Sequence, residues 1–327
     1  MNATIEKQNG KTKINLCGEN PLKILQLTDI HLGGGVLSKK QDALALSAVE
    51  KIVNKSDPDL IVVTGDICYP FLYKAGTHNN MKACNAFGEL MTRLNRPWTF
   101  VFGNHDGETF AKYDKRELAD YFESLPNCLF EKGEPMQGLG NYSIPVYNAD
   151  GSLNTVLMFL DSNSYLSWHF FSGFDTIHQD QIDWYKNEIS SFGENGDLPQ
   201  SIAFFHIPPK EFKEGWDKCV LGKTDEVTYH SGFVQEKDNY FGYPKTVEGT
   251  FIREMIDFGS MKGFFCGHDH LNTLSITYKG IRMTYGMSID YLAYRDISNR
   301  HTQRGGTLIL LSSDKTFDVR PVPLSSC

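Results

Sequence analysis

Five short motifs rich in Asp, His and Asn are the part of this sequence whose side chains could do chemistry. Carboxylate, imidazole and amide groups are suitable ligands for Zn, Fe and Mn, and the motifs offer no thiolate. A set of this kind indicates a metal centre. In chain order the motifs are Asp29-Ile30-His31, Gly65-Asp66, Gly103-Asn104-His105-Asp106, His206 and Gly267-His268-Asp269-His270.

Each motif alone has an ordinary explanation, so the prediction depends on their conjunction. An Asp-x-His is often a solvated turn, a Gly-Asp after a strand is often a helix cap, and a lone His206 is often a core residue. However, five of the ten histidines fall within the motifs. We interpret the remaining five as surface or structural residues; they are His78, His169, His178, His230 and His301.

Strands and helices must position these motifs, and each motif follows an apolar run typical of a strand. Strands are expected at 23–28, 59–66, 98–106, 141–148, 155–162, 201–209 and 263–270, with three or four more within 272–320. Helices are expected at 40–54, 80–95, 115–124, 178–190 and 248–258. This order predicts an α/β fold. Since the carboxyl ends of parallel strands meet at one edge, we expect the motifs to converge there.

The bulk properties exclude several classes of protein. The 327 residues show no repeat or low-complexity linker, which predicts a single domain over 1–327. The net charge of -8 argues against a nucleic-acid partner. We see no signal peptide and no run that could cross a membrane, so we expect a cytoplasmic protein without a membrane partner. Segments 163–177 and 207–246 look like long irregular loops that flank the site.

Two metal ions about 3.5–4 Å apart form a clamp for in-line displacement at phosphorus. Asp66 is the natural bridge, because a carboxylate can give one oxygen to each metal, and a bridging hydroxide would supply the rest. Two divalent ions, the carboxylates of Asp29 and Asp66 and one hydroxide sum to a charge of about +1, which suits a phosphate anion. Neutral His and Asn ligands would preserve that charge.

The motifs resemble the five-block signature of the calcineurin-like metallophosphoesterase superfamily, which reads D-x-H, G-D, G-N-H-D/E, H and G-H-x-H. The match is complete and in order over 29–270. The resemblance implies a four-layer αββα sandwich with two mixed β-sheets flanked by helices. Further segments resemble the small purple-acid-phosphatase-like branch; they are FLDS (159–162), Gln181-x-x-Trp184, FHIPPKEF (205–212), Ser231-Gly232-Phe233, FCGHDH (265–270) and YG (285–286).

The resemblance also implies roles for single residues. It implies one metal ion held by Asp29, His31, Asp66 and His270, and a second held by Asp66, Asn104, His206 and His268. The metals would be divalent or trivalent Fe, Mn or Zn ions. Asn104 could also bind a phosphate oxygen. His105 would act on the leaving-group oxygen, with Asp106 either orienting its ring or capping the backbone of the following turn.

The expected function is hydrolysis of phosphomonoesters by in-line attack of a metal-bridging hydroxide. The partner would be a phosphorylated substrate, either a small molecule or a phosphoprotein. A phosphodiesterase that acts on cyclic nucleotides or other diesters is the alternative, because the same motifs serve both reactions. A binding scaffold that has lost catalysis is a third reading, although neither the ligands nor His105 is missing.

Overall fold

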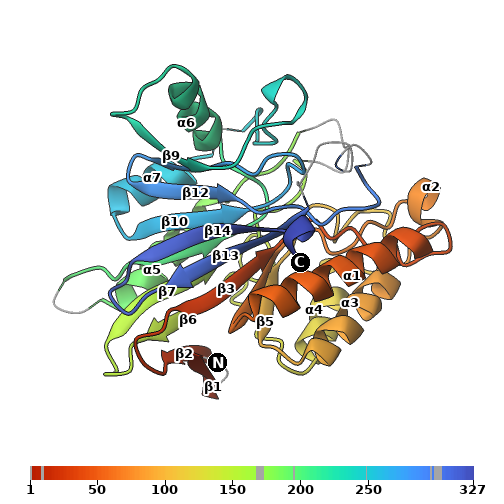
Figure 1. Ribbon diagram of the computed structural model, residues 1–327, viewed down its shortest axis with the longest axis horizontal. Helices are drawn as coiled ribbons and strands as arrows, with labels where there is room; N and C mark the ends of the chain where they lie inside the picture. The colour runs from red at the N-terminus through yellow and green to blue at the C-terminus, as the bar shows by residue number, and fades with distance from the viewer. Residues whose placement is uncertain are drawn as a thin grey trace.

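Two β-sheets lie at the centre of the computed structural model, which describes residues 2–8, 11–166, 173–193, 196–247, 249–294, 297 and 304–327. The smaller sheet has five strands in the order β14-β13-β3-β4-β5 (Figure 1). Its strands β3, β4 and β5 are parallel, whereas β13 pairs antiparallel with β3 and β14. The bounds are β3 Leu22–Leu27, β4 Leu60–Thr64, β5 Trp98–Val101, β13 Gly305–Leu311 and β14 Phe317–Pro323.

The larger sheet has nine strands in the order β1-β2-β6-β7-β8-β10-β12-β11-β9. Its centre is parallel, with β8 between β7 and β10, and antiparallel pairs complete both edges. The bounds are β1 Ala3–Gln8, β2 Lys11–Leu16, β6 Tyr142–Tyr147, β7 Leu153–Phe159, β8 Ser201–Phe204, β9 Val227–Ser231, β10 Met261–Cys266, β11 Ser275–Tyr278 and β12 Ile281–Tyr285.

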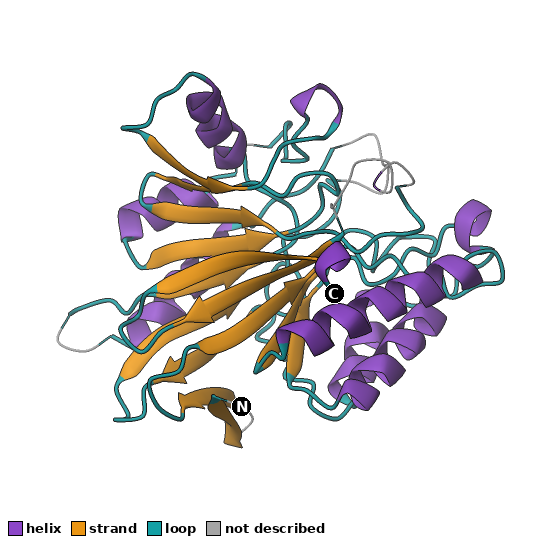
Figure 2. Ribbon diagram, viewed as in Figure 1, coloured by secondary structure: helices purple, strands orange, loops and turns teal. Residues whose placement is uncertain are grey.

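Helices cover the outer faces of both sheets (Figure 2), which gives the αββα layers that were expected. Helices α1, α3 and α4 lie on the side of the smaller sheet, and α5, α6 and α7 on the side of the larger one. The bounds are α1 Lys39–Ser56, α2 Leu72–Ala75, α3 Asn80–Leu94, α4 Lys115–Glu123, α5 Gln179–Ser191, α6 Glu211–Val220, α7 Phe251–Phe258 and the 3-10 turns η2 Lys237–Asn239 and η4 Leu324–Ser326.

Alternation along the central strands builds the two apolar layers of the core. In β7 and β8, Leu157 and Phe204 belong to a cluster shared with the smaller sheet, whereas Met158 and Ala203 pack with residues of α5 and α7. Successive strand residues point to opposite faces, so a strand buried on both sides is apolar throughout. This explains why β7, β8 and β10 read as short continuous apolar runs.

The structure also differs from the sequence-based expectation. The segment 207–246 is not an irregular loop, because it contains α6, β9 and η2. The hairpin of β1 and β2 at the N-terminus was not anticipated either, because exposed polar residues interrupt the apolar pattern along its strands. In the other expected loop, 163–177, the positions 167–172 lie outside the described residues.

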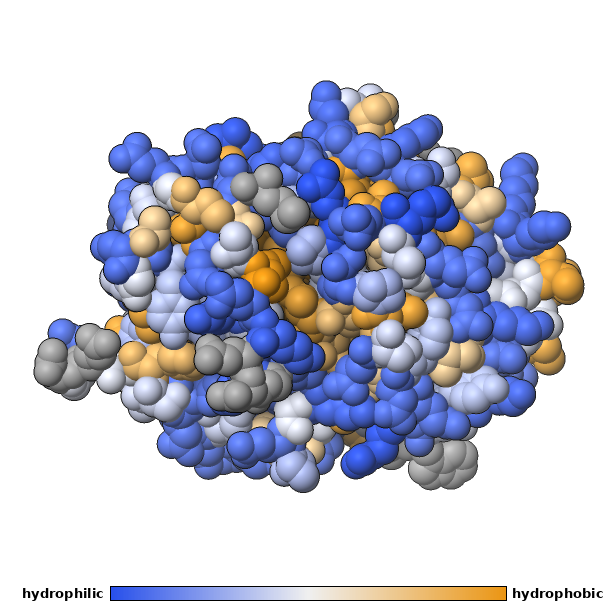
Figure 3. All heavy atoms as spheres, turned by 90° about the horizontal axis from the view of Figure 1, so that it is seen from below, coloured by the Kyte–Doolittle hydropathy of each residue, from blue (hydrophilic) through white to orange (hydrophobic). Residues whose placement is uncertain are grey.

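The exterior is largely polar on the face seen in Figure 3, where hydrophobic residues show near the centre and in smaller groups toward the edges. Large apolar side chains that are exposed include Val36 and Leu37 after β3, and Val220 and Leu221 at the end of α6. None of the helices in the described part of the chain is long and apolar enough to cross a membrane.

Candidate metal centre

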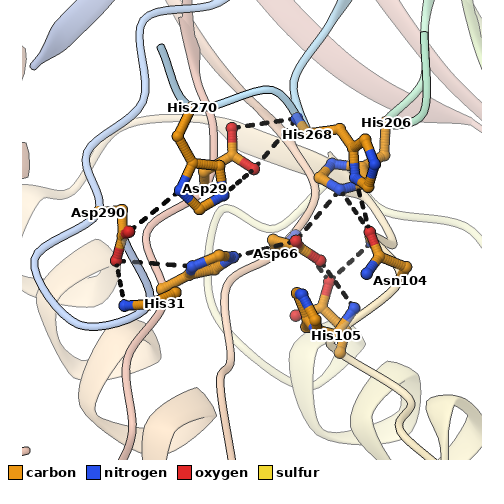
Figure 4. Close-up of polar contacts among 12 residues, drawn as sticks. Asp29, His31, Asp66, Asn104, His105, His206, His268, His270 and Asp290 are labelled. Carbon is orange, nitrogen blue, oxygen red and sulfur yellow. Dashed lines mark hydrogen bonds and ion pairs between the residues drawn. The ribbon is translucent and has the colours of Figure 1, made fainter. Parts of the chain in front are cut away.

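The five motifs converge where the carboxyl ends of strands from both sheets meet. Asp29 and His31 follow β3, Asp66 follows β4, and the remaining motifs follow β5, β8 and β10. Two hydrogen bonds join the sheets beside them. Gln26 Nε2 donates to Cys266 O at 2.9 Å, and His206 Nδ1 donates to Thr64 O at 2.8 Å. The smaller sheet therefore positions four of the seven predicted ligands and the larger sheet positions the other three (Figure 4).

The backbone turns sharply at four of the predicted ligands. Asp29, His31, Asp66 and His268 have φ values of 51°, 51°, 57° and 78°. Non-glycine residues seldom adopt this left-handed region, and each instance costs on the order of 1–3 kcal/mol. The surrounding structure must offset this cost. The turns redirect the side chains from the strand faces toward a common point.

Two motif glycines are required for close approach. A Cβ atom at Gly103 would collide with the Asp66 carboxylate, and one at Gly267 would collide with the Thr28 hydroxyl and come within 2.9 Å of Asp29 Oδ2. Both glycines therefore let a neighbouring strand end pass against a predicted ligand.

A first group of ligand atoms comes from Asp29, His31 and His270. One atom from each lies within 4.8 Å of the other two, and His270 Nε2 is 3.6 Å from Asp29 Oδ1. Tyr69 stacks on the His31 ring with centroids 5.0 Å apart, which shields that imidazole from water. These three side chains are arranged as a cation site with mixed nitrogen and oxygen donors.

A second group comes from Asn104, His206 and His268. Asn104 Oδ1 lies 3.1 Å from His206 Nε2 and 2.9 Å from His268 Nδ1. The ring of Phe174 packs edge-on against His268 at a centroid distance of 4.3 Å. The amide oxygen and the two ring nitrogens thus face one point, as ligands of a shared ion would.

Asp66 lies between the two groups. Its Oδ2 is 3.0 Å from His31 Nε2 and 3.2 Å from His206 Nε2, while its Oδ1 accepts the backbone N–H of His105 at 2.9 Å. We expected the carboxylate to give one oxygen to each metal. In the structure Oδ1 accepts a backbone N–H and the single oxygen Oδ2 faces both groups, so the bridging role stays a prediction.

The electrostatics favour cations at both positions. Burial would lower the pKa of His31, but hydrogen bonds and charges from Asp290 and Asp66 raise it to about 10. Burial would also lower the pKa of His206, but the charge and the hydrogen bond of Asp66 raise it to about 9. Both pKa shifts favour positive charge at the positions where the metal ions are expected. Nitrogen and oxygen donors without thiolate fit Zn, Fe or Mn, so the donor set suits the metals that were expected.

His105 stands beside the two groups and has a carboxylate partner that the sequence analysis missed. Its Nδ1 lies 2.6 Å from Glu108 Oε1, and Glu108 is 6% exposed. One ring nitrogen of His105 is also within 4.8 Å of ligand atoms of His31 and Asp66. The spacing of three residues from His105 to Glu108 was a visible signal, because such residues face each other in a single turn.

Asp106 does not have the ring-orienting role that we considered for it. Its Oδ2 accepts the N–H groups of Asp66 and Gly103, and its Oδ1 accepts that of Cys68. These three bonds occupy both oxygens, and Glu108 holds the His105 ring instead. Asp106 therefore binds backbone N–H groups, as the alternative interpretation held, but these belong to the loop after β4 and to Gly103 and not to the following turn.

A second missed residue is Asp290, in the loop that follows β12. Its Oδ2 lies 3.1 Å from His270 Nδ1, and its Oδ1 lies 3.6 Å from His31 Nδ1. Its side chain is fully buried. Nothing in its local spacing marks it as part of a site, because it lies 20 residues beyond the last motif.

The histidines outside the motifs have other partners. His78 Nδ1 lies 3.2 Å from Pro70 O, His178 Nε2 lies 2.9 Å from Asp175 Oδ1, and His230 Nε2 lies 2.8 Å from Thr277 Oγ1. These contacts agree with the structural roles expected for them. His169 and His301 lie outside the described residues.

Comparisons with known proteins find similarities in sequence and in fold. Residues 22–272 match the family described as calcineurin-like phosphoesterase. The chain is 28% identical over 317 residues to "Probable inactive purple acid phosphatase 29" of Arabidopsis thaliana, covering 88% of this chain and 76% of that protein. It is 27% identical over 284 residues to "Phosphatase DCR2" of Saccharomyces cerevisiae, covering 80% and 46%.

Among solved structures, a dimetal phosphatase from Danio rerio superposes with a TM-score of 0.58. The superposition covers 93% of this chain and 97% of that one, at 11% sequence identity. At this identity the likeness concerns the fold, and it extends over nearly the whole of both chains.

Proposed function

Because this chain belongs to the calcineurin-like phosphoesterase family, we propose that it is an active dinuclear phosphomonoesterase. The position of Asp66 carries the proposal. One carboxylate oxygen lies 3.0 Å from a nitrogen of the first ligand group and 3.2 Å from a nitrogen of the second. A carboxylate oxygen placed between two ligand groups would suit a pair of neighbouring metal ions.

In this proposal Asp29, His31, Asp66 and His270 hold one ion, and Asp66, Asn104, His206 and His268 hold the other. When bound, the two ions would supply an activated water nucleophile at neutral pH and neutralise charge on the phosphate. His268 is ready to serve as a neutral ligand, because burial and the charge of His206 hold its pKa well below the usual range. The amide nitrogen of Asn104 would be free to turn toward a phosphate oxygen only by leaving the hydroxyl of Tyr165, 2.9 Å away.

His105 is proposed to give its proton to the leaving-group oxygen. With Nδ1 directed at Glu108, the other ring nitrogen is available for the ester oxygen. Glu108 would stabilise the imidazolium form before the transfer, and the neutral ring remains afterwards. Acid catalysis of this kind contributes about 10²–10⁴-fold in rate.

Two alternatives compete with this proposal. A phosphodiesterase would use the same ligands. A non-catalytic scaffold is suggested by the word "inactive" in the name of the Arabidopsis relative. Against the scaffold, both ligand groups are assembled and His105 has its carboxylate partner. The names "purple acid phosphatase" and "Phosphatase DCR2" of the relatives favour the monoester.

Turnover of p-nitrophenyl phosphate and bis(p-nitrophenyl) phosphate tests the proposal. Metal-stripped protein would be reloaded separately with Zn²⁺, Mn²⁺ or Fe²⁺, its metal content measured, and both esters assayed against the stripped protein as control. We expect metal-dependent turnover with the monoester preferred in kcat/KM. A preference for the diester would contradict the phosphomonoesterase proposal and favour a phosphodiesterase instead. No turnover of either ester with two ions bound would favour the scaffold.

A further inference from the structure

The histidines of the first ligand group contact a buried carboxylate through their Nδ1 atoms. In the second group, His206 contacts a backbone carbonyl through its Nδ1 atom. Asp290 faces the Nδ1 atoms of both His31 and His270, at 3.6 and 3.1 Å, which leaves the Nε2 atoms directed into the site (Figure 4). In the second group, His206 Nδ1 meets the neutral carbonyl of Thr64 instead. The two ligand groups therefore differ in the charge of the group that contacts their imidazole Nδ1 atoms.

His31 depends on Asp290 for a partner on that side. Its Nδ1 is buried and has no hydrogen bond within ordinary limits among the described residues. The carboxylate oxygen at 3.6 Å is close enough for an ion pair and would need a shift of about half an ångström to reach hydrogen-bond distance. His270 already has that distance. One carboxylate thus serves two imidazoles of the same group.

The Asp290 carboxylate is held rigidly by its own loop. Its Oδ1 accepts the N–H groups of Leu292 and Ala293 at 2.7 and 2.8 Å, and its Oδ2 accepts that of Tyr294 at 2.5 Å. Arg304, just before β13, donates to the carbonyl of Asp290 at 2.8 Å. These bonds fix the carboxylate before any ion binds.

Lys74 of α2 ties the same loop to the other side of the site. Its Nζ donates to Leu292 O at 3.0 Å and to Ala293 O at 2.6 Å. The loop is thereby anchored to α2 through Lys74 and to the residue before β13 through Arg304. A carboxylate fixed from two directions can orient a ligand ring at little entropic cost.

We propose that Asp290 is a positioning residue that orients His31 and His270 together and thereby sets the affinity of one of the two metal ions. It would fix the ring tautomers with Nδ1 protonated and make both Nε2 atoms more basic. Removal of such a partner typically lowers metal affinity about 10–100-fold. The ion held by Asn104, His206 and His268 should be unaffected, because His206 Nδ1 contacts the Thr64 carbonyl and His268 Nδ1 faces Asn104.

The test is an equilibrium titration of Asp290→Asn with Zn²⁺ at buffered free concentrations, with bound zinc counted by elemental analysis. We expect one of the two ions to require about 10–100-fold more free zinc than in the unchanged protein. The His268→Gln variant identifies the steps, since it weakens the other ion. The zinc-binding step that is weakened in Asp290→Asn must be the same step that persists unchanged in His268→Gln. Equal weakening of both ions, or of neither, would overturn the proposal.

Asp59→Asn is the matched control. Asp59 is 3% exposed, and like Asp290 it accepts backbone N–H groups, from Asn2 and Lys23, but it lies at the opposite end of β4 from the site. This variant should bind both ions normally. If Asp290→Asn does not fold, as judged by circular dichroism, Asp290→Glu takes its place, because it keeps the charge but displaces it by one methylene. Wild-type zinc binding in a folded Asp290→Glu would then count against the proposal.

The inference rests on the proposed function only for the presence of two ions. Zinc binding is measured without turnover, so the two ideas fail separately. A protein that binds two ions and hydrolyses no ester would refute the phosphoesterase proposal and leave the Asp290 comparison intact.

Discussion

The imidazoles of this site differ in the group that contacts their Nδ1 atoms and in where their other nitrogen is directed. His105 has Glu108 at 2.6 Å, from its own turn of chain. His206 has a backbone carbonyl, and His31 and His270 share Asp290. The Nε2 atoms of His31 and His270 are directed into the first ligand group, so these rings are suited to donate lone pairs to a metal ion. His105 lies beside the two groups, and with Nδ1 directed at Glu108 its other ring nitrogen is placed to give a proton to a leaving group.

Replacement of His105 by alanine should therefore leave both metal ions bound and lower kcat by about 10²–10⁴-fold. Glu108→Gln should show a smaller loss with the same metal content, because the ring remains but the charge behind it is removed. Steady-state kinetics and elemental analysis of both variants provide the measurement. An active His105→Ala variant would contradict the role assigned to the ring, and a variant without metals would make His105 a ligand.

At the scale of elements, Asp106 holds together the loops that follow β4 and β5. It is 1% exposed and accepts three backbone N–H groups at 2.8–3.0 Å, two after β4 and one after β5. One of these donors belongs to Asp66. The carboxylate therefore fixes the spacing between two strand ends that carry predicted ligands, and its contribution is to architecture.

Asp106→Ala should destabilise the protein strongly, because each buried donor left unpaired costs about 1–3 kcal/mol. It should also lose metal ions, since the turn at Asp66 would relax. Chemical denaturation and metal analysis would measure both effects. Asp114→Ala is the control: it removes the capping box of α4 and should cost about 1 kcal/mol without loss of metal. Normal stability of Asp106→Ala would contradict the proposed role of Asp106 in holding the loops after β4 and β5 together.

The sequence predicted the elements that carry the motifs, because those strands are buried on both faces and read as unbroken apolar runs. Strands β3, β4 and β5 and helices α1, α3 and α4 appear close to their expected ranges. The hairpin of β1 and β2 escaped notice because its strands are half-exposed and rich in Lys and Thr. Helix α6 and strand β9 were not predicted, because both are short and polar and apolar residues are mixed along them.

Prediction of the site was limited by contacts that leave no local trace. The seven proposed ligands could be named because each follows a strand end, but the single-oxygen geometry of Asp66 depends on a bond to a backbone N–H 39 residues away. Asp290 reaches the site through a loop whose spacing carries no signal. The single-domain extent and the cytoplasmic location remain predictions.

At the scale of the whole molecule, the charge balance of the site links folding to pH. In the metal-free protein the folded pKa values of His31 and His206 are raised to about 10 and about 9, above the ordinary value of 6.5. A raised pKa means that the folded state binds more protons than the unfolded state, so this contribution is complete below pH 6.5 and is lost as pH rises through 9 to 10. His268, with a lowered pKa, acts in the opposite sense, but only at and below its usual range.

Metal-free protein should therefore lose thermal stability as pH rises from about 7 to 10, whereas the stabilisation by added Zn²⁺ should grow over the same window, because zinc replaces those protons. Thermal unfolding of chelator-treated and zinc-loaded protein at pH 7, 8, 9 and 10 measures both trends. His230→Gln, a change on the outer strand β9, should leave the slopes unaltered. A metal-free midpoint that climbs across this window would show that the buried histidines are not protonated.

The division of the site between the two sheets has a consequence for how the chain folds. Asp29 accepts the backbone N–H of His268 across 239 residues of sequence. Contacts of such long range form late, because the loop between them must close first. We therefore expect the ligands to come together only after both sheets have docked. A metal ion would then stabilise the finished structure and would not act as the nucleus from which folding begins.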